Sequence, residues 1–267
     1  MTALLEARDL VVERGRSRVL HEASLSLRAG EALAVVGPNA AGKSTLLRTM
    51  AGLLVARSGE VRLKDRPQGA WKRVAWARAI ALVAAEEEGA ATLLVADRVA
   101  LGRYPHCGPF RPFTVHDHEA VSRALAQTGI EHLAGRALGT LSAGERQLAA
   151  LARGLAQEPE ILLLDEPASH LDIGHQLRLF AVLDEVRRRG VGVLAVVHDL
   201  QRAGAWAERM ALLFQGRVID EGSPSSVLSG NGAAEAFGVT ITAHALPALP
   251  HPLYSFAPRV DEGDRRP

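Results

Sequence analysis

One nine-residue segment, Gly37–Thr45, constrains the fold of this chain more than any other feature. It reads Gly-Pro-Asn-Ala-Ala-Gly-Lys-Ser-Thr and satisfies the pattern G-x-x-x-x-G-K-[ST]. The apolar run Glu31–Val36 before it predicts a buried strand, and Ser44–Met50 after it predicts the start of a helix. A loop between such a strand and helix presents backbone N–H groups and a positive helix end to phosphate. The segment therefore predicts a nucleotide site in an α/β protein.

The residue types in this loop indicate individual roles. Lys43 is long enough to reach the β and γ phosphates, and the Ser44 hydroxyl is a ligand for Mg²⁺. A Cβ at Ala40 is tolerated only if the backbone φ there is negative. The predicted nucleotide-binding residues of the loop are Gly37, Pro38, Asn39, Ala40, Ala41, Gly42, Lys43, Ser44 and Thr45.

A second segment supplies carboxylates that fit the same site. The four apolar residues of 161–164 precede Asp165-Glu166-Pro167, and such a run is typical of a strand buried on both faces of a parallel sheet. Open α/β sheets bind ligands at the carboxyl ends of their strands. We therefore expect Asp165 to hold Mg²⁺ through water and Glu166 to polarise the attacking water as a general base.

These motifs and three others follow one another in the order that a known family has. The chain resembles the ATP-binding subunit of an ABC transporter over roughly residues 3–230. The phosphate loop matches the Walker A motif, and Ile161–Pro167 matches Walker B with the catalytic glutamate. His198, which follows the apolar run Val191–Val197, matches the switch histidine. Residues 141–147 match the family signature, with Ala143 where glycine is usual, and 169–172 match the D-loop.

The resemblance implies a mechanism that needs two copies of the chain. Glu166, His198 and Lys43 are then the catalytic residues, and ATP and Mg²⁺ are bound. The signature residues Ser142, Ala143, Gly144 and Glu145 open a helix whose positive end faces the γ-phosphate held by the other protomer. The resemblance thus implies a head-to-tail dimer with two ATP molecules sandwiched between the subunits, and it assigns Asp172 to the D-loop. ATP binding closes this dimer and hydrolysis reopens it.

Ala40 and Ala143 stand where glycine is usual in the family, and two further positions depart from the family pattern. The glutamine that contacts Mg²⁺ and relays to the membrane partner aligns with Ala85 or, after a one-residue shift, with Glu86. Glu86 could replace it as a metal ligand, or the acidic run 86–88 could be a solvated surface. The aromatic residue that stacks on adenine aligns with Arg14, whose guanidinium can stack on a base or simply be exposed in a turn. Both alternatives stay open at both positions.

The segment Leu101–His106 indicates which kind of transporter the chain serves. It resembles ATPases of the iron-siderophore, haem and vitamin B12 importer group. The implied partners are a second copy, a polytopic permease and, indirectly, a substrate-binding protein. One alternative is a divergent nucleotide-binding module with little turnover that acts as a structural or regulatory partner. Another is an ABC protein acting on ribosomes or iron–sulfur assembly, although ribosome-acting members usually carry two cassettes.

The resemblance and the local patterns together predict a P-loop NTPase fold. We expect an α/β core with a mixed sheet at 1–85 and 159–230, an inserted helical subdomain at 86–158 and a tail at 231–267. The N-terminal part should form an antiparallel sheet. Helices are predicted over 119–127, 144–157 and 172–189, a loop over 104–113, and a hairpin over 210–220.

Composition excludes other classes of protein. There are 31 basic and 30 acidic residues, no basic stripe is evident, and aromatic residues make up only 4%, so we expect no nucleic-acid partner. The single Cys107 excludes an internal disulfide and fits a reducing compartment. No apolar run approaches ~18 residues, and the start of the chain lacks the pattern of a signal peptide. The expected location is the cytoplasmic face of the cell membrane, through the permease.

Overall fold

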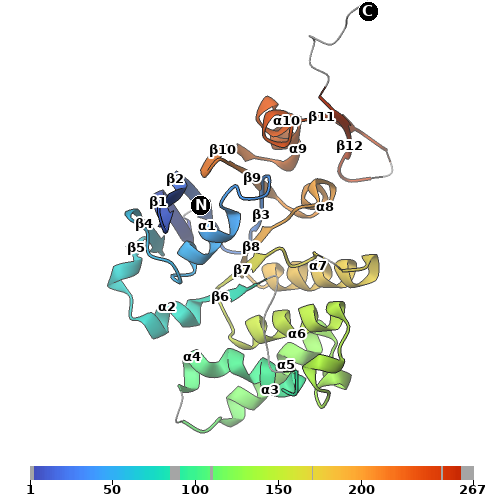
Figure 1. Ribbon diagram of the computed structural model, residues 1–267. Coiled ribbons are helices and arrows are strands. Elements are labelled where there is room, and N and C mark those ends of the chain that lie inside the picture. Colours follow the sequence, from blue (N-terminus) through green and yellow to red (C-terminus); the bar gives the residue numbers. More distant parts are fainter. Residues whose placement is uncertain (1–2, 85–90, 109–110, 170, 248, 260–267) are drawn as a thin grey trace, which may run out of the picture.

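The computed structural model describes residues 3–84, 91–108, 111–169, 171–247 and 249–259. Three sheets organise this part of the chain (Figure 1). A four-stranded antiparallel sheet has the order β2-β1-β4-β5, a six-stranded mixed sheet has the order β10-β9-β3-β8-β7-β6, and β11 pairs with β12. The strands are β1 Leu5–Arg14, β2 Ser17–Leu27, β3 Ala32–Val36, β4 Ser58–Leu63, β5 Arg66–Pro67, β6 Ile80–Val83, β7 Ile161–Asp165, β8 Gly192–Val196, β9 Arg209–Phe214, β10 Arg217–Gly222, β11 Val239–His244 and β12 Leu253–Pro258.

Helices cover the six-stranded sheet and form a separate layer at its β6 side (Figure 1). The α-helices are α1 Lys43–Met50, α2 Arg73–Ala79, α3 Val95–Ala100, α4 Tyr104–Cys107, α5 Val115–Thr128, α6 Ala143–Ala156, α7 Ile173–Arg188, α8 Leu200–Trp206, α9 Pro224–Ser229 and α10 Asn231–Phe237. Short 3₁₀ turns are η1 Gln68–Ala70, η2 Leu101–Arg103, η3 Glu131–Leu133 and η4 Leu138–Thr140. The helical layer is built from α3, α5 and α6, which pack on one another.

Strand β3 shows why the sheet is buried on both faces. Its five residues are all fully buried, and side chains alternate between the two faces of a strand. Leu33 and Val35 pack in one core with α1 and the antiparallel sheet. Ala32, Ala34 and Val36 pack in a second core with the helices of the opposite face. The sequence of β3 is therefore continuously apolar rather than alternating.

The parallel strands bring the predicted site together. β3 pairs with β8 and β9, and β7 pairs with β6 and β8, all in parallel. The phosphate loop follows β3, Glu166 follows β7 and His198 follows β8 by two residues. These three segments consequently meet at one edge of the sheet. The predicted α/β fold with a mixed sheet, an antiparallel N-terminal sheet and a helical insertion is confirmed.

Local predictions agree with the structure except in one loop and the tail. The predicted helices are observed as α5, α6 and α7, and the hairpin as β9–β10. The predicted loop over 104–113 is wrong at its start, because Tyr104–Cys107 forms a helical turn. Pro105 lies in the first turn, where a missing N–H costs no intrahelical hydrogen bond. The tail contains α10 and the β11–β12 hairpin, which the sequence analysis did not identify.

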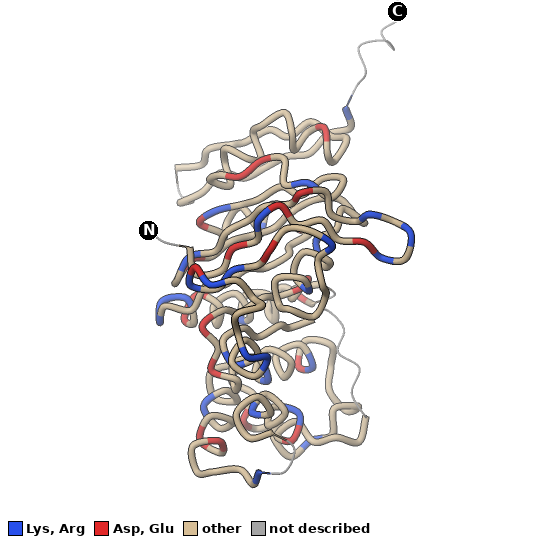
Figure 2. The backbone as a smooth tube through the Cα atoms, turned by 90° about the vertical axis from the view of Figure 1, so that its left-hand side faces the viewer, with Lys and Arg blue, Asp and Glu red and all other residues tan. Residues whose placement is uncertain are grey.

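The predicted domain boundaries at 85/86, 158/159 and 230/231 stay predictions, and the first of them lies outside the described residues. Basic and acidic residues are interspersed along the chain (Figure 2). Within the described residues, no helix is both long and apolar enough to cross a membrane.

Candidate nucleotide site

Two glycines shape the phosphate loop. Gly37 has φ 154° and Gly42 has φ 104°, in the region that disfavours residues with a Cβ. A Cβ at Gly37 would overlap the carbonyl oxygen of Leu213, and one at Gly42 would lie 2.9 Å from Leu20 Cδ2. Gly42 is the N-cap of α1, and no side chain caps this helix end. The helix N-terminus therefore keeps its positive end for an anion.

Ala40 contradicts the condition inferred from the sequence. Its φ is 61°, not negative, so a residue with a Cβ occupies the left-handed region. The side chain is exposed, so the strain is confined to the backbone of the residue itself. This conformation costs an L-residue about 1–2 kcal/mol, which the rest of the loop must offset.

Lys43 lies inside the loop. It is 5% exposed, and its Nζ donates hydrogen bonds of 2.8 Å to the carbonyl oxygens of Gly37 and Pro38. Burial lowers the pKa of Lys43, opposed by the nearby charges of Glu166 and Asp165. The ammonium group is thus held among the loop carbonyls and beside two carboxylates, at the position where a phosphate would add negative charge.

Ser44 and Asp165 form a pair across the sheet edge. Ser44 Oγ donates a 2.9 Å hydrogen bond to Asp165 Oδ1. Asp165 is only 6% exposed, and burial raises its pKa despite that hydrogen bond. A hydroxyl and a buried carboxylate are oxygen donors of the kind Mg²⁺ prefers, so the two residues fit this ion. Glu86, the third predicted ligand, lies outside the described residues.

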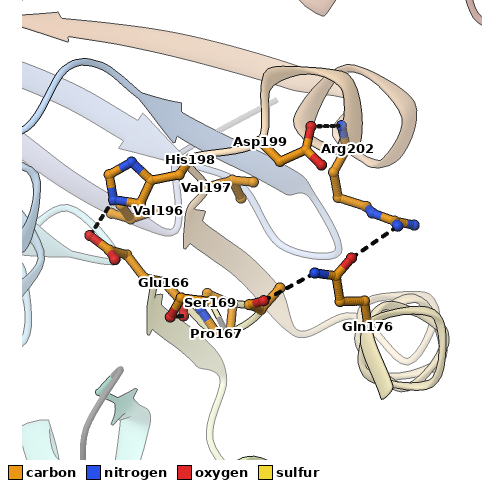
Figure 3. A pocket seen from close by; sticks show the side chains of 10 residues that line it. Glu166, Pro167, Ser169, Gln176, Val196, Val197, His198, Asp199 and Arg202 are labelled. Atoms are coloured by element: carbon orange, nitrogen blue, oxygen red, sulfur yellow. Dashed lines mark hydrogen bonds and ion pairs between the residues drawn. The ribbon is translucent and has the colours of Figure 1, made fainter. Parts of the chain in front are cut away.

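Glu166 and His198 are directly paired. His198 Nε2 lies 2.5 Å from Glu166 Oε1, as Figure 3 shows. Glu166 has φ 51°, a strained conformation for a non-glycine residue. Its N–H donates to Val196 O on β8 at 3.2 Å, and its carbonyl accepts from Ser169 Oγ at 2.8 Å. These bonds hold the backbone of the strained turn, from which the carboxylate extends toward the switch histidine.

Arg14 lines a cavity together with the phosphate loop. The cavity, of about 320 Å³, is lined by Arg14, Val19, Glu166 and the loop residues 39–45. The sequence analysis missed Val19, for which no motif gives a signal. Arg14 itself is exposed in the structure, next to the turn at Gly15. Its stacking role stays a prediction.

The signature motif opens helix α6, as expected, and also caps it. Ser142 is the N-cap of α6, and its Oγ accepts from Glu145 N at 3.2 Å while Glu145 Oε2 accepts from Ser142 N at 2.7 Å. These bonds to Ser142 lower the pKa of Glu145. Ala143 is exposed and Gly144 is buried. None of these four residues lines the cavity at the phosphate loop of the same chain.

Asp172 of the D-loop is the N-cap of α7. Its Oδ1 accepts from His175 N at 2.8 Å, and its Oδ2 lies 2.8 Å from His175 Nδ1. The structure also places Gln176 and Arg202 in a cavity of about 210 Å³ next to Glu166 and His198. The sequence analysis missed His175, Gln176 and Arg202, because they lie outside the matched motifs.

Comparison with known proteins agrees with this geometry. A family model described as ABC transporter matches residues 20–169. The hemin import ATP-binding protein HmuV of Myxococcus xanthus is 41% identical over 256 residues, which cover 93% of this chain and 95% of that protein. The ferric enterobactin transport ATP-binding protein FepC of Escherichia coli is 37% identical over 238 residues, with coverage of 89% and 88%.

A solved structure supports the same conclusion at the level of the fold. A metal-chelate type ABC transporter in an inward-facing conformation superposes with a TM-score of 0.83 and 25% identity, covering 96% of this chain and 98% of the matched one. The phosphate loop, the Asp165–Glu166 turn and His198 occupy one sheet edge, and relatives match along nearly the whole length. The chain therefore belongs to the ABC transporter family and is an ATP-hydrolysing subunit of such a transporter.

Proposed function

We propose that this subunit powers the import of an iron complex, either a siderophore or haem, or of vitamin B12. The relatives that cover nearly all of the chain are named for hemin and ferric enterobactin import. The observation that carries the catalytic part is the 2.5 Å pair of Glu166 and His198 beside the buried Lys43. Glu166 would be the general base, His198 would contact the γ-phosphate, and Lys43 would be the phosphate-binding cation, so one place holds all three groups.

ATP would be held by the loop and its lysine. The backbone N–H groups of 39–45 and the uncapped start of α1 would bind the phosphates, and Lys43 would exchange its two carbonyl partners for phosphate oxygens. Arg14 borders the same cavity and would contact the adenine. The exchange is favourable because the ammonium gains an anionic partner in a buried place.

Mg²⁺ would be held by Ser44 and Asp165, and by Glu86 if that residue replaces the missing glutamine. The ion would supply positive charge that neutralises the β and γ phosphates. Glu166 would take the proton of the attacking water, and His198 would orient the γ-phosphate. The pair of Glu166 and His198 must then separate enough for each side chain to reach its own target.

Two copies would complete each site. The N-terminus of α6 would bind an anion, and its Ser142 and Gly144 do not line the cavity at the phosphate loop of their own chain. They would contact the ATP of a second copy in a head-to-tail dimer, with Asp172 in the interface. ATP binding would then close the dimer.

The permease would contact the segment 101–106, whose 3₁₀ turn η2 packs on α3 and α6 of the helical layer. In the segment 101–106, Leu101 and Tyr104 are 47% and 55% exposed, whereas Gly102 and Arg103 are buried. Two exposed apolar side chains on a rigid support are suited to a protein partner. The chain would thereby reach the cytoplasmic face of the membrane, and a substrate-binding protein would deliver cargo to the permease.

The hydrolysis step is tested by turnover of the purified chain with Mg²⁺ beside Glu166→Gln. We expect turnover in the parent, at least a hundredfold less in the variant, and an ATP-dependent dimer of the variant on size exclusion. Equal turnover in both would refute the role of Glu166. ATP binding without turnover, even with the permease present, would support the divergent module instead.

The cargo is tested with the permease reconstituted in vesicles. Uptake of a ferric siderophore, haem or cobalamin is compared in the presence of ATP and with Glu166→Gln as the inactive control. ATP-dependent uptake of one of the three identifies the substrate class. Uptake of none, with intact ATP hydrolysis, would refute the cargo proposal and leave the ATPase activity standing.

A further inference from the structure

The start of helix α7 contacts three elements: the signature helix α6, the D-loop and helix α8, which follows the switch histidine. His175 and Gln176 are neighbours in the sequence, but their side chains contact different elements. His175 lies against Gly144 of α6, and Gln176 bonds to the D-loop and to Arg202 of α8. Neither side chain lines the cavity at the phosphate loop. Their contacts therefore join parts of the site without reaching its nucleotide.

The Gln176 amide uses its donor and acceptor on two different segments. Its Nε2 donates to Ala168 O at 3.2 Å, just before the D-loop, and to Leu171 O at 3.1 Å, within the D-loop. Its Oε1 accepts from Arg202 Nη2 at 3.1 Å. Figure 3 shows Gln176 between the Glu166–Ser169 turn and Arg202. A single amide thus bridges the D-loop and α8.

Arg202 carries this bridge to the switch histidine. Its backbone N–H donates to Asp199 Oδ1 at 3.0 Å, and Asp199, the N-cap of α8, is the residue next to His198. The Arg202 guanidinium also lies 5.7 Å from the centre of the Phe180 ring on α7. The first turn of α8 is therefore held against α7 by two contacts of the Arg202 guanidinium.

His175 makes the corresponding connection to the signature. Its Nδ1 and its backbone N–H both bond to the carboxylate of Asp172. A Cβ built on Gly144 would lie 2.5 Å from the His175 ring, so the ring packs directly on the backbone of the signature helix. Displacement of α6 relative to the D-loop would therefore have to move this ring and its partner Asp172.

We propose that His175 and Gln176 are positioning residues that couple the signature helix, the D-loop and the switch histidine. The proposal rests on the proposed head-to-tail dimer. Contact of Ser142 and Asp172 with a second copy is transmitted through the Gln176–Arg202 bridge to the loop that holds His198. The geometry that joins Glu166 to His198 then depends on whether the partner is in place.

The test compares the steady-state ATPase kinetics of Gln176→Met, Arg202→Met and the double variant with the parent. Methionine keeps the length of glutamine and removes its hydrogen bonds. Networks of this kind couple sites by about 0.5–2 kcal/mol, which is a factor of ~2–30. We expect kcat to fall about tenfold in Gln176→Met, with KM for ATP changed less than twofold. Arg202→Lys should restore most of the activity lost in Arg202→Met.

Gln201→Met is the matched control. This residue is a glutamine on the same helix as Arg202, but its Oε1 accepts from Tyr254 N of the C-terminal hairpin at 2.7 Å. It should leave kcat within about twofold of the parent value. The double variant Gln176→Met with Arg202→Met should lose no more activity than the more impaired single variant, because the two changes remove one bridge.

His175→Phe tests the second connection, since it keeps a ring against Gly144 and the backbone bond to Asp172 but loses the Nδ1 bond to that carboxylate. In the Glu166→Gln background we expect it to raise the ATP concentration needed for the dimer about tenfold. Equal kcat in the parent, Gln176→Met and Gln201→Met would overturn the proposal. So would losses that multiply in the double variant. A parent that forms no ATP-dependent dimer would refute the proposed dimer and this coupling together, whereas unaffected dimers in the variants would refute the coupling alone.

Discussion

Replacement of Arg103 by methionine should destabilise the chain substantially. Arg103 is 2% exposed, and its guanidinium donates to Asp117 Oδ1 at 2.8 Å, to Ala156 O at 2.8 Å and to Glu158 Oε2 at 2.7 Å. These partners belong to α5, to the end of α6 and to the residues just after it. One side chain therefore joins the helices of the helical layer.

The magnitude follows from what the change leaves behind. Breaking a buried pair by removing one partner costs about 3–5 kcal/mol, because the remaining charge stays buried. Asp117 is 4% exposed, but it keeps two bonds from Thr114, its hydroxyl at 2.6 Å and its backbone N–H at 2.9 Å. These bonds and the Arg103 pair hold the pKa of Asp117 well below its usual range. The loss should therefore be near the lower limit, about 3 kcal/mol.

The assay is thermal and urea unfolding of the purified chain beside Arg123→Met. A loss of about 3 kcal/mol lowers Tm by roughly 6–12 °C in a chain of this size. Arg123 bonds to Glu158 as well, at 3.0 Å, but its side chain is 48% exposed, so its replacement should cost about 0–1 kcal/mol. A Tm change below about 2 °C for Arg103→Met, or equal changes in both variants, would refute this reasoning.

Three further outcomes are expected, two at the nucleotide site and one at the start of α6. Lys43→Ala should lower ATP affinity at least about tenfold in a direct binding assay, because the charge-assisted phosphate contact is lost. Asp165→Asn should raise Tm without nucleotide yet abolish Mg²⁺-dependent turnover. The folded-state pKa of Asp165 is raised by burial, so ionisation above that pKa destabilises the fold and the amide removes this cost. Ser142→Ala should cost about 1 kcal/mol in urea unfolding through the lost cap.

Each of these has a result that would contradict it. Unchanged ATP binding in Lys43→Ala would remove that residue from the site. A lower Tm in Asp165→Asn, or stability of the parent that rises with pH through the titration of this carboxyl, would show that burial is not its main perturbation. Unfolding of Ser142→Ala at the parent urea concentration would show that the capping box contributes nothing.

Sequence motifs predicted the chemistry of the site because they are local. The loop 37–45 needs glycine at defined backbone positions and a lysine at a fixed spacing, and both requirements are visible in one segment. The carboxyl ends of β7 and β8 could be assigned because continuous apolar runs precede Asp165 and His198. The α/β class and the helical insertion followed from these runs and from the family resemblance.

Backbone conformation and long-range contacts were decided only by the tertiary structure. The positive φ of Ala40 and Glu166 depends on neighbouring segments that hold these residues, such as the bond from Glu166 N to Val196 O. The Gln176–Arg202 bridge joins residues on two helices with a strand between them, and no periodicity reports which polar side chains will meet.

The segment 101–106 shows most clearly which features the sequence determines and which only the folded structure determines. Its sequence alone indicated a group of importers, and it predicted a loop from Tyr104 onward. The folded chain divides the segment instead, with Arg103 buried in an ion-pair network and Tyr104 exposed on a helical turn. Local sequence determines which groups are available for charge, capping and phosphate binding. Only packing determines which of them lose their water, because burial depends on elements that are distant in the chain.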